Sequence, residues 1–165
     1  MKRFALLFSF IFSGYIFAAT EVTDMSGRKI TLPEKIEKSF ASAPPMGLLS
    51  YILAPETMTA MNLPLDSNFY FKDTKYLNPS LKKLPVVGGW HGNSKGANME
   101  TLLSLKPQVI LAWKSDFVMK EVEKTFAKFN IPVFFITEDS VEDEPSAIRA
   151  AGVALKKEER AELLA

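Results

Sequence analysis

The single histidine of the chain, His91, follows Trp90 on a glycine-rich loop, GGWHGNSKGAN at 88–98. An imidazole can act as a general base, a hydrogen-bonding group or a metal ligand. One histidine cannot hold a bare zinc or nickel ion, because such sites need three or four protein donors. It could bind an already chelated metal, hydrogen-bond a ligand, or face solvent. Trp90 could offer a flat face to a ligand or pack into the core.

Most catalytic arrangements do not fit this loop. In a phosphate-binding loop a lysine follows the second glycine, whereas Lys95 precedes Gly96 here. Trp90 and Asn93 interrupt the glycine pattern of a dinucleotide site. A serine triad would have to use His91 as its base. The chain has no cysteine, which excludes a thiol nucleophile and a cysteine zinc site. We therefore expect no enzymatic activity and keep a hydrolase only as an alternative.

Strands and helices alternate along the chain after an N-terminal hairpin at Glu21–Leu32. The apolar runs predict strands at Lys38–Ala43, Thr57–Asn62, Pro85–Val87, Val109–Ala112 and Val133–Ile136, with helices from Pro45, at Met99–Leu105 and at Asp116–Phe129. This order predicts an α/β fold, in which a parallel sheet is flanked by helices as in a Rossmann-like lobe. Ligands of such sheets sit outside the carboxyl ends of the strands. The Trp90 loop follows a strand, so we expect it on that rim.

The first residues have the layout of a secretory signal peptide. Lys2 and Arg3 precede an apolar run from Phe4 to Phe17, and small residues follow. We predict cleavage near Ala18, a signal peptide at 1–18 and a periplasmic location, with an N-terminal membrane anchor as the alternative. Removing 1–18 takes away two of the 20 basic residues and none of the 19 acidic ones. The near-neutral remainder offers no electrostatic footprint for nucleic acid.

The last predicted helix begins near Ser140 and has no stop signal. Its pattern, ending in KKEERAELLA, continues to Ala165 without a closing Gly, Asn or Pro. This pattern suggests that the sequence is a fragment whose final element is incomplete.

Glu100 lies in the first turn of the helix that follows the loop. A carboxylate there gains about 0.3–1 kcal/mol from the helix dipole. This stabilisation alone would explain a glutamate at this position. The same exposed charge could instead dock an arginine of another protein. The sequence does not choose between these two roles.

Two motifs resemble the cluster-III periplasmic binding proteins of ABC importers for ferric siderophores, haem, cobalamin and nickel chelates. The first is TDMSGRKITLP at Thr23–Pro33, and the second is the stretch LPVVGGW…ANMETLLSLKPQVILAW at 84–113. Gln108 stands where the family usually has aspartate. The resemblance covers residues 21–165 in order and spacing.

The resemblance implies two α/β lobes that face each other across a ligand cleft and are joined by a long rigid helix. Residues 19–140 would be the N-terminal lobe, and 141–165 would begin the connecting helix. The second lobe would be absent.

The resemblance also implies roles for particular residues. Trp90 matches a cleft-facing aromatic position, and Pro44, Pro45 and Met46 match the cleft-side turn after the first strand. Glu100 matches a glutamate that docks on an arginine of the membrane permease. His91 matches no general family position, so its contact with a chelated metal is tentative.

The leading hypothesis is therefore a monomeric periplasmic protein, without a cofactor of its own, that captures a chelated metal and delivers it to an ABC permease. An exported sensing or docking domain without ligand capture is the second hypothesis. An exported hydrolase is the third.

Overall fold

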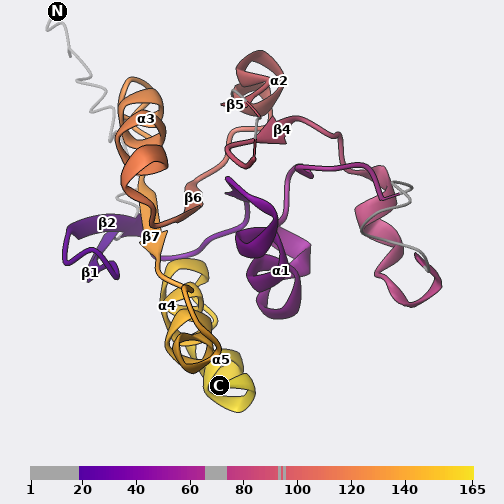
Figure 1. The fold of residues 1–165 in the computed structure, drawn as a ribbon. Helices are drawn as coiled ribbons and strands as arrows, with labels where there is room; N and C mark the ends of the chain where they lie inside the picture. Colours follow the sequence, from indigo (N-terminus) through magenta and orange to yellow (C-terminus); the bar gives the residue numbers. More distant parts are fainter. Residues whose placement is uncertain (1–18, 66–73, 93, 95) are drawn as a thin grey trace, which may run out of the picture.

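The structure, a computed structural model, describes residues 19–65, 74–92, 94 and 96–165 (Figure 1). The predicted signal peptide and its cleavage site near Ala18 lie outside the described residues. Within these ranges, no helix has both the length and the apolar character required to cross a bilayer.

A parallel sheet forms the centre of the fold, as the sequence predicts. Its three regular strands are β3 (Ser39–Ala41), β6 (Val109–Trp113) and β7 (Val133–Ile136), in the order β3-β6-β7. Strands β3 and β6 pair in parallel, and Phe40 lies opposite Ile110 in their register. Because all three strands run the same way, their carboxyl ends meet at one edge of the sheet.

Two shorter segments continue the sheet beyond β3. Parallel bridges join Ser39 to Met58 and Met61 to Val86. The backbone N–H of Met61 donates to Pro85 O at 2.9 Å, which supports the second bridge. The spatial order is therefore 85–87, 58–61, β3, β6 and β7. The chain thus reverses its direction of travel across the sheet between β3 and β6, and such switch points are where open α/β sheets bind ligands.

Helices cover both faces of the sheet (Figure 1). On one face, α1 (Pro44–Leu53) and α4 (Glu144–Leu155) pack over a buried cluster that includes Leu111 of β6. On the other face, α2 (Met99–Ser104) and α3 (Asp116–Ala127) contribute side chains to a second cluster that includes Ile110 of β6. Neighbouring strand residues therefore supply opposite cores, as the two-residue period of a strand requires.

The predicted N-terminal hairpin is present as β1 (Ala19–Thr23) and β2 (Lys29–Pro33), which pair antiparallel. The buried carboxylate of Asp24 attaches its turn to the sheet. It accepts the backbone N–H of Phe135 at 3.3 Å and the guanidinium of Arg28 at 2.7 Å. The Arg28 guanidinium lies 4.3 Å from the centre of the Phe135 ring, a favourable cation–π contact.

These contacts change the pKa of Asp24. Burial alone raises the pKa, but hydrogen bonds from Arg28 and from the backbone of Phe135 outweigh it, so the pKa lies below its usual value of 3.8. A carboxyl with a lowered pKa stabilises the fold above the pKa of the unfolded chain. That contribution is lost as the pH falls through the folded-state pKa.

The prediction of one continuous helix from Ser140 to Ala165 is wrong. A 3-10 turn at Val141–Asp143 precedes α4, and a separate helix, α5 (Glu158–Leu164), follows it. Lys156 separates α4 from α5, with the left-handed φ of 57° that usually closes a helix.

Small residues explain why α5 folds back on α4. A Cβ atom placed on Gly152 would lie only 2.4 Å from Cβ of Ala161, so the two helices cross closely at this glycine. Arg149 and Glu162 also pair across the helices at 2.9 Å. The role of 141–165 as a connection between lobes remains a prediction.

Asp24→Asn tests the attachment of the hairpin. We expect the substitution to lower the free energy of unfolding at pH 7 by about 2 kcal/mol, because a charged hydrogen-bond acceptor is lost. The difference from the native chain should shrink below about pH 4, where the native carboxyl also takes up a proton. Urea denaturation across this pH range measures both effects.

The control is Glu21→Gln on the same hairpin. Glu21 pairs with Lys29 at 2.7 Å, but both side chains are largely exposed, so the change should cost less than about 1 kcal/mol. Equal losses for the two variants would contradict the special role of Asp24.

Candidate functional site

Three loops meet at the carboxyl edge of the sheet. They are Ser42–Pro45 after β3, Gly88–His91 after the segment 85–87, and Trp113–Ser115 at the end of β6. We call these residues the carboxyl rim. The rim includes the switch point between β3 and β6, so it is the place where this fold would hold a ligand.

The Trp90 loop is tied to the end of β3 by close backbone contact. The N–H of Trp90 donates to Ser42 O at 2.7 Å. A Cβ atom on Gly89 would lie 2.3 Å from the same oxygen, so only glycine allows this approach. The loop is closed at its base by the antiparallel pair β4 (Gly88–Gly89) and β5 (Gly96–Ala97).

A buried asparagine joins the same loops from the other side. Asn62, which is 8% exposed, donates through Nδ2 to Ala41 O at 2.9 Å and to Gly88 O at 3.0 Å. One amide therefore satisfies carbonyl groups from both the end of β3 and the start of the loop. The sequence analysis had placed Asn62 only at the end of a strand.

The structure places the ring of Trp90 in the core. The side chain is 7% exposed, and its ring meets Phe126 of α3 edge-on, with 5.6 Å between the ring centres. On another side, a Cβ atom placed on Gly96 would lie only 3.4 Å from the indole ring. The sequence allows the ring either to face a ligand or to pack into the core, and the structure has it packed into the core. A flat face offered to ligand is not seen, and the contact of Trp90 with a ligand remains a prediction.

Of the five buried side-chain polar atoms without a hydrogen-bond partner among the described residues, three belong to rim residues. Trp90 Nε1, His91 Nε2 and Ser42 Oγ are buried and have no hydrogen-bond partner among the described residues. A buried polar atom without a partner costs about 1–3 kcal/mol, so native structures rarely keep several near one another. Ser42 Oγ and Trp90 Nε1 can donate a hydrogen bond to an acceptor atom of a ligand, and His91 Nε2 can donate or accept according to its tautomer.

The three ligand-contacting residues predicted after β3 differ in their exposure to solvent. Pro44 and Pro45 begin α1, where a missing N–H costs nothing, and both are partly exposed. Met46 is fully buried in the core beneath α1. Its side chain points away from solvent because it follows the inward face of the helix, so we leave Met46 out of the ligand-contacting set.

Glu100 is exposed in the first turn of α2, as predicted. Asn98 caps this helix, and its side chain accepts the N–H of Thr101 at 3.1 Å. The position is compatible both with a favourable dipole interaction and with docking to another protein. Docking therefore remains a prediction.

Sequence analysis did not single out Trp113. The residue ends β6, next to the switch point, and 37% of its surface is exposed. The sequence feature that could have pointed to Trp113 is its place directly after the apolar strand VILA, which is fully buried. Trp113, and not Trp90, presents an accessible aromatic side chain on the rim.

The stretch GNSKG at 92–96 also has the Gly-x-Ser-x-Gly spacing of a hydrolase nucleophile turn. In hydrolases this turn joins a strand to a helix. Here Ser94 lies between Gly92 and β5, and its hydroxyl donates to Gly96 O at 3.3 Å. The local structure therefore differs from that of a nucleophile turn.

Outside the rim, the segment after β7 carries a partly desolvated carboxyl group. Burial raises the pKa of Glu138, which follows β7, and the neighbouring charge of Glu144 adds to the rise. Over the part of the chain that the structure describes, no three His, Asp or Glu side chains are placed to share a metal ion.

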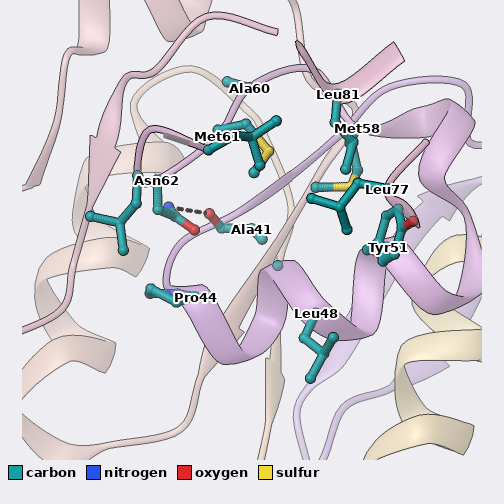
Figure 2. Close-up of a pocket in the computed structure, with 13 residues that line it drawn as sticks. Ala41, Pro44, Leu48, Tyr51, Met58, Ala60, Met61, Asn62, Leu77 and Leu81 are labelled. Atoms are coloured by element: carbon teal, nitrogen blue, oxygen red, sulfur yellow. Dashed lines mark hydrogen bonds between the residues drawn. The ribbon is translucent and has the colours of Figure 1, made fainter. Parts of the chain in front are cut away.

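Beside the rim lies a pocket of about 170 Å³, which we call the α1 pocket (Figure 2). Of the predicted ligand residues, only Pro44 lines it. The lining consists of Ala41, Pro44, Gly47, Leu48, Tyr51, Met58, Ala60, Met61, Asn62, Leu63, Leu65, Leu77 and Leu81. The pocket is therefore separate from Trp90 and His91.

Comparison with known proteins identifies relatives of the chain. It is 33% identical over 84 residues to the vitamin B12-binding protein of Pectobacterium carotovorum, which is 51% of this chain and 29% of that protein. It is 35% identical over 57 residues to the vitamin B12-binding protein of Photorhabdus laumondii, or 34% of this chain and 19% of that protein. No protein-family model matches the chain.

Solved structures show the same relationship. An ABC transporter solute binding protein from Sulfurospirillum deleyianum matches with a TM-score of 0.79 and 32% identity, over 87% of this chain and 44% of that one. A TroA-like periplasmic binding protein, FepB from Veillonella parvula, matches with a TM-score of 0.70 and 26% identity, also over 87% and 44%. The chain thus spans less than half the length of the proteins it matches.

The fold and these matches define the class: the chain is a relative of the periplasmic solute-binding proteins of ABC transporters. More particularly, its parallel sheet flanked by helices matches the fold of these TroA-like structures. The relatives named above are binding proteins and not enzymes.

Gly89→Ala tests the contact that holds the rim together. The new methyl group would overlap Ser42 O and force the loop away from β3. We expect a loss of about 1–3 kcal/mol in the free energy of unfolding, as for other overpacked sites. In a Trp113→Phe background, the emission of Trp90 should shift to longer wavelength as its ring becomes hydrated.

Gly47→Ala is the matched control. Its Cβ would make an ordinary 3.6 Å contact, and alanine is favoured over glycine within a helix. Native stability and unchanged Trp90 emission in the Gly89→Ala chain would show that the loop does not depend on this approach.

Proposed function

We propose that the chain is the ligand-capturing lobe of a periplasmic binding protein for a chelated metal, which it delivers to an ABC permease. Vitamin B12 is the first ligand to test, because two of the relatives described above are named for it. Haem, ferric siderophores and nickel chelates belong to the same class of ligand. The reaction is capture and delivery, with no covalent bond made or broken.

The observation that carries this proposal is the group of unpaired polar atoms on the carboxyl rim. Ser42 Oγ, Trp90 Nε1 and His91 Nε2 lie at the switch point of the sheet and lack partners among the described residues. A chelated metal presents acceptor atoms such as carbonyl and carboxylate oxygens around its periphery. Such atoms would satisfy the unpaired donors and recover their desolvation cost.

The aromatic surface needed for a flat chelate comes from Trp113. An indole face gives a large contact area to a planar ring system at little conformational cost. His91 belongs to the same rim and would contact the ligand through a hydrogen bond or an open coordination position of its metal. The two prolines at the start of α1 would border the ligand with fixed backbone geometry.

The buried ring of Trp90 favours a second candidate, a sensing or docking domain that does not capture ligand. With this ring in the core, the lobe offers less aromatic area than the sequence suggests. Titration with ligands separates the two candidates.

Tryptophan fluorescence is the test of ligand capture. We expect cyanocobalamin, or another chelate of the series haem, ferric siderophore and nickel–histidine, to quench the emission in a saturable way. In a Trp90→Phe chain, where Trp113 is the sole tryptophan, the quenching should persist. Free N-acetyltryptophanamide corrects for light absorbed by the ligand.

His91→Ala should weaken this binding about tenfold, the effect of losing roughly 1.4 kcal/mol of contact. Glu159→Ala, at an exposed position on α5, serves as the control and should bind as the native chain does. The absence of a saturable response to every chelate would favour the domain without ligand capture.

Glu100→Ala tests delivery to the permease. If Glu100 docks on the permease, ligand affinity should stay within about twofold, whereas ligand uptake by cells that carry the transporter should fall at least about tenfold. This follows because breaking a docked charge pair costs about 2–5 kcal/mol. Glu159→Ala, which also removes an exposed carboxylate from the first turn of a helix, controls for loss of charge. Unchanged uptake would leave Glu100 with only its helix-stabilising role.

A further inference from the structure

The α1 pocket has the chemistry of a second binding site, which lies beside the rim and shares Pro44 with it (Figure 2). It lies between α1, the segment 58–65 and the leucines at 77 and 81. Its lining is almost entirely aliphatic, and it includes no charged side chain among the described residues. A charged ligand would lose its hydration there without compensation, so the pocket selects against ions.

The size of the pocket limits what can fill it. Its volume is about 170 Å³. An apolar cavity of about 150 Å³ in another protein stays dry and binds benzene. The α1 pocket therefore accommodates one six-membered ring with a small substituent.

One polar atom in the pocket is free. Nδ2 of Asn62 donates to two carbonyl groups, which also establishes which side-chain atom is oxygen. Oδ1 of Asn62 accepts no hydrogen bond from any described residue, and it lies 3.6 Å from the Cβ position of Gly47 on the pocket wall. A ligand that approaches Gly47 would meet this acceptor.

A second polar group stands on the other side of the pocket. The hydroxyl of Tyr51 accepts the backbone N–H of Asn78 at 3.1 Å. Figure 2 shows Tyr51 and Asn62 on opposite sides, with apolar side chains between them. A buried water molecule needs two to four polar partners, and among the described lining residues only Asn62 and Tyr51 carry polar side-chain atoms.

We propose that the α1 pocket binds a neutral, single-ring molecule or ring substituent that carries an O–H or N–H donor. The ring contacts the leucine and methionine side chains, and the donor binds Asn62 Oδ1. The same asparagine holds the ends of β3 and the Trp90 loop through its Nδ2. Occupancy of the pocket therefore acts on a residue that supports the rim.

The test uses 4-fluorophenol and 4-fluorotoluene, two rings of similar size of which only the first has a donor. Fluorine NMR of the complete 165-residue chain measures the binding of both. We expect saturable binding of fluorophenol, about three- to tenfold tighter than that of fluorotoluene, as one net hydrogen bond would give.

Gly47→Leu is the blocking variant. Gly47 lies within α1 without a left-handed backbone, so leucine fits the helix, and its side chain would fill the pocket. Fluorophenol affinity should fall at least about tenfold, while Gly47→Ala should cause a smaller loss. Ala127→Leu adds the same side chain at an exposed position of α3 and should bind fluorophenol normally.

Absence of saturable fluorophenol binding by the native chain would overturn the proposal, as would normal binding by a folded Gly47→Leu chain. Equal affinity for both probes would overturn the assignment of a donor-bearing ligand. Neither probe is a metal chelate, so a failure of chelate capture at the rim leaves these outcomes unaffected.

Discussion

The close approach of Gly89 to the backbone of Ser42 is the constraint on which the candidate site depends. At this point there is no room for a side chain, because a Cβ atom would come within 2.3 Å of Ser42 O. The contact lets Trp90 donate to the same oxygen and lets Asn62 reach carbonyl groups on both segments. The loop after 85–87 is thereby held over the end of β3, although the two are more than 40 residues apart in sequence.

The contacts that stabilise the fold and the candidate binding residues lie in different parts of the structure. The buried clusters on the two faces of the sheet are apolar, and the Asp24–Arg28 pair joins the hairpin to β7 with nearly all its polar atoms matched. At the carboxyl rim, by contrast, Ser42, Trp90 and His91 keep unmatched polar atoms. Unpaired polar groups are unfavourable for folding. Their presence on the rim is the basis of the proposed ligand site.

The rim and the α1 pocket differ in the ligands that they suit. The rim offers hydrogen-bond donors and the exposed indole of Trp113, which match the acceptor-rich edge of a large chelate. The pocket offers one free acceptor, Asn62 Oδ1, in an aliphatic surround that fits a single ring. Asn62 belongs to both regions because its two side-chain atoms face in different directions. The solved relatives are more than twice as long as the matched region, so the rim supplies only part of the surface that a whole protein of this class would have.

The sequence by itself determined the parallel sheet, the N-terminal hairpin, the Asn98 cap and the position of the Trp90 loop on the rim, because these follow from local periodicity and turn chemistry. Only the tertiary structure decided which way side chains point. The ring of Trp90 points into the core because it packs between Phe126 and Gly96. Met46 is buried because it lies on the inward face of α1. Lys156 ends α4 in a left-handed conformation where one continuous helix was predicted, and the close Gly152–Ala161 contact holds α5 against α4. Each of these outcomes depends on residues distant in sequence, whose contacts no local pattern encodes.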